Sequence, residues 1–325
     1  MLNIAIIAGG DSGEYTISMK SGKQVELNLD REKYIPFLIE IRSSDWFYHF
    51  KEEKIPVDKN DFSIRLDGKK IRFDVVFNAI HGTPGEDGKL QGYFDMLKIP
   101  YTSSGVTTSA LTFNKAFCKS VVAAAGIPTA KSVHLFADSP DPVSAIWEEI
   151  TFPCFVKPNN GGSSVGMSKV TQPEDLEAAL EKAFREDPEI LVEEFIKGRE
   201  LTCGVISSEG KVMAFPVTEI ISKKEFFDFE AKYRDDLVDE VCPAKVPAEI
   251  FTECQRTSTE LFRKLNCAGV VRFDYILRGN TLFFLEVNTV PGLTAQSIVP
   301  KMAAANGWSV KELFSRMIED CYKTF

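Results

Sequence analysis

The stretch from Val271 to Thr294 constrains the fold most, because it holds two apolar runs separated by a short turn sequence. The runs VRFDYIL and TLFFLEVN are rich in β-branched and aromatic residues, and Arg278-Gly279-Asn280 lies between them. This pattern predicts a β-hairpin with a glycine-containing turn. A turn centred near Gly279 would place Arg272 opposite Glu286.

One face of this hairpin carries charged and amide side chains. Because side chains alternate across a strand, Arg272 and Asp274 share a face of the first strand, and Glu286 and Asn288 share a face of the second. Two carboxylates and an amide oxygen form an all-oxygen set suited to Mg²⁺. The alternative is an Arg272–Glu286 salt bridge on an exposed face. The apolar neighbours favour a buried site, where a cation compensates the carboxylates.

The composition limits the class of protein. A chain of 325 residues is long enough for two or three domains, and 44% hydrophobic and 26% charged residues are typical of a soluble globular protein. The net charge of −9 argues against a nucleic-acid or membrane-surface partner. No apolar run reaches the length of a membrane span. Seven scattered cysteines without C-x-x-C predict reduced thiols in a cytoplasm, and neither a disulfide framework nor a zinc site.

The first hundred residues predict a parallel α/β sheet. Residues 3–8, NIAIIA, form a continuous apolar run that is typical of a buried strand, and a helix is expected from near Ile17. Further strands are expected at 34–41 and 74–80, whereas residues 45–73 show no clear pattern. The Gly-rich loops after the first and third strands lie at strand carboxyl ends, where open α/β sheets bind ligands.

These two loops contain Glu14 and His81. The charge of Glu14 would repel a phosphate and suits a bound ammonium better. It can also be explained as a first-turn glutamate favoured by the helix dipole. His81 is either a functional residue or a turn histidine without a role.

A boundary between two domains is expected at 99–105, and a helix from Thr107 to Ala125, which carries Lys115, is expected to follow it. A strand then ends at Lys157, and a loop of glycines and serines follows it. Glycine N–H groups and serine hydroxyls can close over phosphates, although the pattern is not a Walker A loop. A flexible hairpin turn is the alternative, and in either case Lys157 is expected to be exposed.

Residues 190–200 predict a strand that breaks into a hinge. The backbone of such a hinge can pair with an adenine edge, and a carboxylate there can accept from ribose hydroxyls. Solvated acidic residues at a strand end are the alternative. Residues 222–245 predict a long loop that could act as a lid. Helices are expected at 248–266, 297–306 and 309–321.

Together these motifs resemble the D-alanine–D-alanine ligases of the ATP-grasp superfamily. The resemblance covers essentially the whole chain and rests on four motifs in order: HGTPGEDG (81–88), VKPNNGGSSVGMSKV (156–170), FDFEAKY (227–233) and VRFDYIL…LEVNTVPGLT (271–294). It implies an α/β ATP-grasp fold with three α/β domains, of which the first has a Rossmann-like parallel sheet. The expected domains are 1–104 for substrate, 105–189 as the central ATP-grasp domain, and 190–325 as the C-terminal ATP-grasp domain with the metal site.

The resemblance also implies a role for each matching position. The implied ATP-binding residues are Lys115, Lys157, Ser164, Glu193, Phe195, Ile196, Glu200 and Lys232. The implied catalytic residues are Glu14, Ser163, Tyr233, Arg272, Gly292 and Ser297, with Arg272 and the Gly292 N–H as oxyanion stabilisers. The implied substrate-binding residues are Glu14, His81, Arg272, Ser297 and Ile298. The implied metal ligands are Asp274, Glu286 and Asn288.

The implied reaction joins two D-alanines through an acylphosphate, for peptidoglycan precursor synthesis. ATP is the co-substrate, and the cofactor is two Mg²⁺ ions, with Mn²⁺ as a possible substitute. The family further implies a homodimer in the cytoplasm.

The chain departs from the family pattern at Tyr15, Phe227 and Gln296, and these departures affect fine substrate contacts only. A D-alanine–D-lactate ligase is an alternative, against which Tyr233 argues, because those relatives lack this hydroxyl. A non-catalytic nucleotide-binding module is a second alternative. Such a module would be expected to lose metal ligands or phosphate lysines, and this chain keeps them all.

Overall fold

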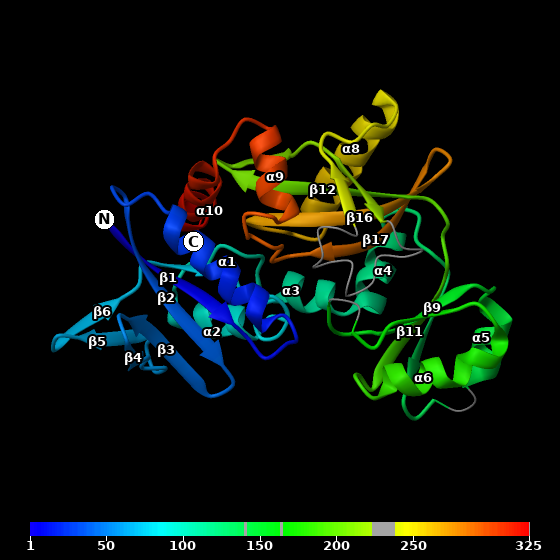
Figure 1. The fold of residues 1–325 in the computed structure, drawn as a ribbon, viewed down its shortest axis with the longest axis horizontal. Coiled ribbons are helices and arrows are strands. Elements are labelled where there is room, and N and C mark those ends of the chain that lie inside the picture. Colours follow the sequence, from blue (N-terminus) through cyan, green and yellow to red (C-terminus); the bar gives the residue numbers. More distant parts are fainter. Residues whose placement is uncertain (140–141, 163–164, 223–237, 325) are drawn as a thin grey trace.

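This computed structural model describes residues 1–139, 142–162, 165–222 and 238–324. They fold into three main β-sheets with flanking helices (Figure 1). The N-terminal sheet has the order β4-β3-β2-β1-β7. Its strands are β1 (Leu2–Gly9), β2 (Tyr34–Arg42), β3 (Asp45–Phe50), β4 (Glu53–Pro56) and β7 (Val75–Asn78). The first, second and seventh strands are parallel, which confirms the predicted parallel core of the sheet.

The segment without a clear sequence pattern, 45–73, extends this sheet. Strands β3 and β4 add to it antiparallel, and β5 (Ser63–Leu66) pairs with β6 (Lys69–Arg72) as a separate hairpin. Helix α1 (Tyr15–Asn28) begins two residues before the predicted start and packs against β1 and β2, and α2 is Lys89–Leu97.

The single helix predicted at 107–125 is wrong, because the structure has two helices there. They are α3 (Val106–Phe113) and α4 (Lys115–Ala124). Asn114 between them is extended, and its side-chain oxygen accepts from the Phe117 N–H at 3.0 Å. Asparagine is a favoured N-cap, so the break begins a second helix with Lys115 as its first residue.

The central sheet is antiparallel and has the order β10-β9-β11-β8. Its strands are β8 (Ser132–Phe136), β9 (Cys154–Pro158), β10 (Ser168–Val170) and β11 (Glu189–Glu194). Its helical segments are α5 (Pro142–Glu149), η1 (Pro173–Asp175) and α6 (Leu176–Phe184). The domain boundary expected at 189/190 falls inside β11, which pairs with β8 and β9.

The C-terminal sheet has the order β15-β14-β12-β16-β17, with β13 also paired to β12. Its strands are β12 (Arg199–Ser208), β13 (Lys211–Ala214), β14 (Thr218–Ser222), β15 (Val238–Val241), β16 (Val270–Arg278) and β17 (Thr281–Asn288). The remaining helices described are α8 (Ala248–Lys264), α9 (Ile298–Ala305) and α10 (Val310–Thr324). The loop predicted at 222–245 is wrong at residues 238–241, which form a strand, and residues 223–237 lie outside the described residues.

The predicted hairpin is confirmed, but its register differs. Asp274 pairs with Glu286 and Arg272 with Asn288, whereas Tyr275 pairs with Phe284. A β-bulge between Asp274 and Tyr275 causes this shift. A one-residue shift turns a strand over, so the bulge brings all four polar residues to one face.

The N-terminal and C-terminal sheets share one hydrophobic core, whereas the central sheet has its own. The shared cluster joins Ile6 and Phe77 to Leu293, Met302 and Phe314. The separate cluster includes Leu135, Val156, Leu180 and Val192. Among the described helices, none is both long and apolar enough to cross a membrane. All seven cysteines are free.

Candidate active site

A cavity of about 1430 Å³ opens where the three sheets meet. Every predicted site residue that the structure describes lines it. These residues are Glu14, His81, Lys115, Lys157, Glu193, Phe195, Ile196, Glu200, Arg272, Asp274, Glu286, Asn288, Gly292, Ser297 and Ile298. Four others, Ser163, Ser164, Lys232 and Tyr233, lie outside the described residues.

The hairpin contributes a buried ion pair to this cavity. Arg272 donates from Nε to Asp274 Oδ1 at 2.9 Å and from Nη2 to Oδ2 at 2.8 Å. Thr202 and Asn288 also donate to the Asp274 carboxylate, at 2.5 and 3.1 Å. Burial opposes the charge on Arg272, but the adjacent Asp274 outweighs it and raises the arginine pKa. The alternative, an Arg272–Glu286 salt bridge on an exposed face, does not match this site, because Arg272 is held in a buried ion pair with Asp274.

The donor set on this face fits a divalent cation. Asp274 and Glu286 stand directly opposite each other, and both line the cavity together with Asn288. Within the described residues no three His, Cys, Asp or Glu side chains form a metal-binding group. The third protein ligand would therefore be the Asn288 amide oxygen. Such a two-carboxylate site suits Mg²⁺, which takes phosphate oxygens and water as its other ligands.

A second charged cluster lies on the central sheet. Glu193 on β11 is 4% exposed, and its two carboxylate oxygens accept from Lys157 at 2.7 Å and from Lys119 at 2.8 Å. Burial alone would raise the pKa of Glu193, but the two ammonium groups lower it to about 2. The expectation that Lys157 is exposed is wrong, because it is 9% exposed and is held in this ion pair.

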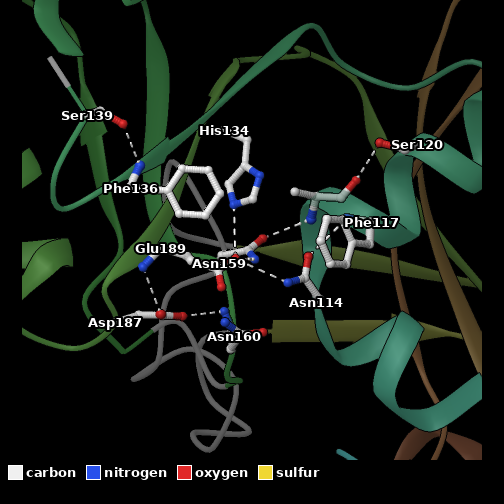
Figure 2. A network of polar contacts seen from close by, with 11 residues as sticks. Asn114, Phe117, Ser120, His134, Phe136, Ser139, Asn159, Asn160, Asp187 and Glu189 are labelled. Atoms are coloured by element: carbon white, nitrogen blue, oxygen red, sulfur yellow. Dashed lines mark hydrogen bonds and ion pairs between the residues drawn. The ribbon is translucent and has the colours of Figure 1, made fainter. Parts of the chain in front are cut away.

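The Gly-rich loop after β9 is anchored by a polar network (Figure 2). One oxygen of Glu189 accepts from His134, Asn114 and Asn159 at 3.1, 3.2 and 2.9 Å. Asn159 in turn accepts from the Ala116 N–H in the first turn of α4 at 2.8 Å. The network thus joins the start of the loop to the start of α4.

Lys115 lies at the point where this network joins α4 to the loop. It is the first residue of α4, and its Nζ donates to the Gly161 carbonyl at 2.5 Å. Its backbone N–H donates to Asn159 O at 3.1 Å. The lysine therefore lies beside the Gly-rich loop at the N-terminus of α4, whose first three N–H groups already donate to Asn159 and Asn114.

The N-terminal loop places Glu14 against the same Gly-rich loop from the other side. A Cβ on Gly162 would lie only 2.8 Å from Glu14 Oε2, so a larger residue at position 162 would displace the carboxylate. The carboxylate therefore reaches the residue that precedes Ser163. Residues from the first and central domains meet here.

Both ring nitrogens of His81 bond within the protein. Its Nδ1 lies 2.8 Å from the Val290 carbonyl oxygen, and its Nε2 lies 3.0 Å from Ser21 Oγ. Burial lowers the pKa of His81, so the ring is neutral, although Glu14 opposes the shift. Val290 also donates its N–H to Glu86 Oε1 at 3.0 Å. Burial and then Glu14 raise the pKa of Glu86 to about 7.

Three residues of the site were missed in the sequence, namely Lys119, Glu86 and Thr202. Lys119 lies one helical turn after Lys115, and a lysine on the apolar face of a helix is a detectable signal. Glu86 lies within the motif HGTPGEDG, from which only His81 was selected. Thr202 could not be found locally, because β12 pairs with β16 across 72 residues of sequence.

Two family models match the chain. The model described as D-ala D-ala ligase N-terminus matches residues 3–104, and that described as D-ala D-ala ligase C-terminus matches residues 121–319. A D-alanine–D-alanine ligase of Flavobacterium johnsoniae is 44% identical over 320 residues, which cover 98% of this chain and 99% of that protein. A D-alanine–D-alanine ligase of Azobacteroides pseudotrichonymphae is 42% identical over 325 residues, which cover 98% and 99% of the two chains.

Solved structures agree with this relationship. A D-Ala:D-Ser ligase from Enterococcus faecalis superposes with a TM-score of 0.88 at 31% identity and covers 99% of both chains. The D-alanine–D-alanine ligase from Coxiella burnetii superposes with a TM-score of 0.87 at 27% identity and covers 99% of this chain and 94% of that one. These neighbours have the ATP-grasp fold, so the predicted fold class is confirmed. The chain belongs to the D-alanine–D-alanine ligase family.

Proposed function

We propose that the chain joins two D-alanines to D-alanyl-D-alanine, consuming ATP, for peptidoglycan precursor synthesis. The observation that carries this proposal is the single cavity that brings together lysines, a two-carboxylate hairpin face and Glu14. Lysines suit a triphosphate, the carboxylates suit divalent cations, and Glu14 suits an ammonium group. The identity to D-alanine–D-alanine ligases supports the choice of substrate.

In the first step the carboxylate of one D-alanine attacks the γ-phosphorus of ATP, the bond from that phosphorus to the β-phosphate oxygen breaks, and an acylphosphate and ADP result. Two Mg²⁺ ions, or Mn²⁺, held by Asp274, Glu286 and Asn288 would neutralise phosphate charge. Lys115, Lys157 and Lys232 would do the same from the protein, and Ser164 would add a hydroxyl donor. Because the structure pairs Lys157 with Glu193, an arriving nucleotide would compete for this lysine.

The adenosine part of ATP would lie along residues 193–200. Glu193, Phe195 and Ile196 would face the adenine, and Glu200 would accept from the ribose hydroxyls. Phe195 is held in place by Phe155, at 5.7 Å between ring centroids, and by the Lys169 ammonium, 4.4 Å above the ring. An aromatic residue held in this way offers an apolar surface beside the base.

In the second step the neutral amine of the other D-alanine attacks the acyl carbon, and the tetrahedral intermediate then expels phosphate as the nitrogen loses a proton and the amide forms. Arg272 and the Gly292 N–H would stabilise the oxyanion of the tetrahedral intermediate. Glu14 would hold the ammonium of the first D-alanine, with His81 beside it, and Ser297 and Ile298 would hold the second carboxylate. Ser163 and Tyr233 would bond with Glu14 and close the site against water.

The test is phosphate release from ATP with a panel of D- and L-amino acids and D-lactate. We expect release with D-alanine and little with L-alanine. Equal release with L-amino acids would reject this choice of substrate. Sedimentation of the purified protein and fractionation of cells would test the homodimer and the cytoplasmic location that we also propose.

Acceptor choice is a second test, because free D-alanine is mostly an ammonium ion near pH 7 whereas D-lactate needs no deprotonation. We propose that Tyr233 favours the amine acceptor. Tyr233→Phe removes a hydrogen bond of about 0.5–1.5 kcal/mol, so the ester-to-amide ratio should rise by several-fold to about tenfold, most at low pH. Mass spectrometry with both acceptors competing from about pH 6 to 9 measures this ratio. An unchanged ratio would exclude Tyr233 as the determinant.

A further inference from the structure

Two side chains of the N-terminal domain hydrogen-bond to the backbone of Val290, one to its N–H and one to its carbonyl oxygen. Glu86 Oε1 accepts from the Val290 N–H at 3.0 Å, and His81 Nδ1 lies 2.8 Å from the Val290 carbonyl oxygen. A carbonyl oxygen can only accept, so Nδ1 carries the proton. The other oxygen of Glu86 accepts from the Gly82 N–H at 2.7 Å. The Glu86 carboxylate therefore bridges two backbone segments that are far apart in the sequence.

We call this set of hydrogen bonds between the N-terminal domain and Val290 a tie, and a second tie holds Leu293, three residues further along the chain. With its proton on Nδ1, the neutral His81 ring accepts at Nε2, so the Ser21 hydroxyl donates to it at 3.0 Å. Ser21 Oγ also accepts from the Leu293 N–H at 3.3 Å. Leu293 is fully buried in the core that the N-terminal and C-terminal sheets share. The network leaves each of these groups with a matching donor or acceptor.

The two ties flank the turn Pro291-Gly292. Val290 precedes the turn and Leu293 follows it, so both of its ends are fixed to the N-terminal domain. On its remaining side Gly292 is packed closely, because a Cβ there would lie 2.8 Å from Ser297 Oγ. The direction of the Gly292 N–H therefore depends on residues of another domain.

We propose that Glu86 is a positioning residue that holds this turn so that the Gly292 N–H points at the reacting carbonyl. The inference rests on the proposed role of Gly292 as an oxyanion donor. Glu86 itself needs no contact with the reacting atoms, because each of its oxygens accepts from a backbone N–H. A glutamine has one acceptor oxygen only, so Glu86→Gln would lose one of the two backbone N–H groups.

The test compares Glu86→Gln with the wild type in steady-state ligation and in ATP binding. Complete removal of an oxyanion donor costs about 10²–10³-fold in kcat. For a displaced donor we expect a fall of about 10- to 100-fold in kcat, with the ATP dissociation constant unchanged within about twofold. Asp87→Asn is the matched control, because this neighbouring carboxylate bonds to Thr83 and Lys89 and not to the turn. It should keep wild-type kcat.

Amide hydrogen exchange supplies a readout that does not depend on activity. The Val290 amide should exchange faster in Glu86→Gln than in the wild type, whereas amides of the central sheet should keep their rates. If Glu86→Gln fails to fold, Ser21→Ala replaces it, with the Leu293 amide as the reporter and the same fall expected in kcat.

A folded variant with wild-type kcat, or with faster Val290 exchange but unchanged kcat, would overturn the proposal. Equal losses in kcat and in ATP affinity would also overturn it, because they would indicate a general structural effect. Failure of the proposed function would be recognised separately, since the wild type itself would then release no phosphate with D-alanine.

Discussion

The two ends of the cavity are built in different ways. At the hairpin end, the N-terminal and C-terminal sheets share one hydrophobic core, and Glu86, His81 and Ser21 tie one domain to the other. At the nucleotide end, the central sheet has a core of its own, and Glu193 binds Lys157 of that sheet and Lys119 of α4, a helix whose apolar side chains pack with the C-terminal sheet. Shared cores resist relative motion, whereas separate domains move by default.

This difference assigns a task to each end. Stabilising a transition state requires groups that are fixed before the reaction, and the hairpin end meets this condition. A nucleotide must enter and leave, which suits the wall whose core is separate. Substitutions at the hairpin end should therefore lower kcat, and substitutions at the nucleotide end should weaken ATP binding.

The largest effect is expected at the hairpin end. Glu286→Gln keeps the shape of the side chain but removes one of the two carboxylates opposed across the strands. Even outer-shell changes cost metal sites about 10–100-fold, so we expect ligation to fall by more than about a hundredfold. Titration with Mg²⁺ checks this, with the melting temperature as the control for folding. Near-wild-type turnover at ordinary Mg²⁺ would contradict the metal assignment.

Lys157→Ala should affect the other end. It removes a phosphate-binding lysine and leaves Glu193 with Lys119 as its remaining cationic partner among the described contacts. We expect ATP affinity to fall by about tenfold or more, since a charge-assisted hydrogen bond contributes about 1.5–3 kcal/mol. Because Lys157 is buried, the free energy of unfolding should also fall, by about 1–3 kcal/mol. Calorimetry and urea denaturation measure the two effects, and unchanged affinity would reject the phosphate role.

Lys119→Met tests how much an ion pair with Glu193 stabilises the fold, because Lys119 bonds to Glu193 but has no proposed contact with phosphate. The lysines lower the pKa of Glu193 from 4.5 to about 2, so their contribution to stability is present above about pH 4.5 and is lost as the pH falls toward 2. The variant should be less stable than the wild type above pH 4.5, and the difference should shrink toward pH 2. Urea denaturation across this range checks it. A difference independent of pH would indicate lost packing in place of lost charge.

The smallest effect is expected at the cap of α4. Asn114→Ala removes the hydrogen bonds to the Phe117 N–H and to Glu189. Loss of an N-cap costs about 1 kcal/mol of stability. Ligation should stay close to wild type if the Asn159 bond to α4 suffices to hold Lys115 in place. Thermal denaturation measures the stability, and a tenfold loss of ATP affinity would show that this cap positions the lysine.

The sequence predicted most of the elements because their patterns are local. The apolar run of β1 and the hairpin of β16 and β17 are examples, and the motifs supplied every predicted cavity residue that the structure describes. The errors have non-local causes. The burial of Lys157 depends on β11, which pairs with its strand and supplies Glu193 only in the folded chain. The bulge in β17 leaves no mark in the alternation of residues.

That bulge determines which changes in strand length the site can accept. Strand β17 holds one residue more than its partner needs between Phe284 and Glu286. Deletion of Leu285 would restore a regular ladder and preserve the apolar contacts near the turn. It would also leave Glu286 and Asn288 in register with β16 while changing the twist that bulges impose. A deletion at this position therefore keeps the polar residues on one face, whereas a deletion between Glu286 and Asn288 would turn Asn288 to the other face.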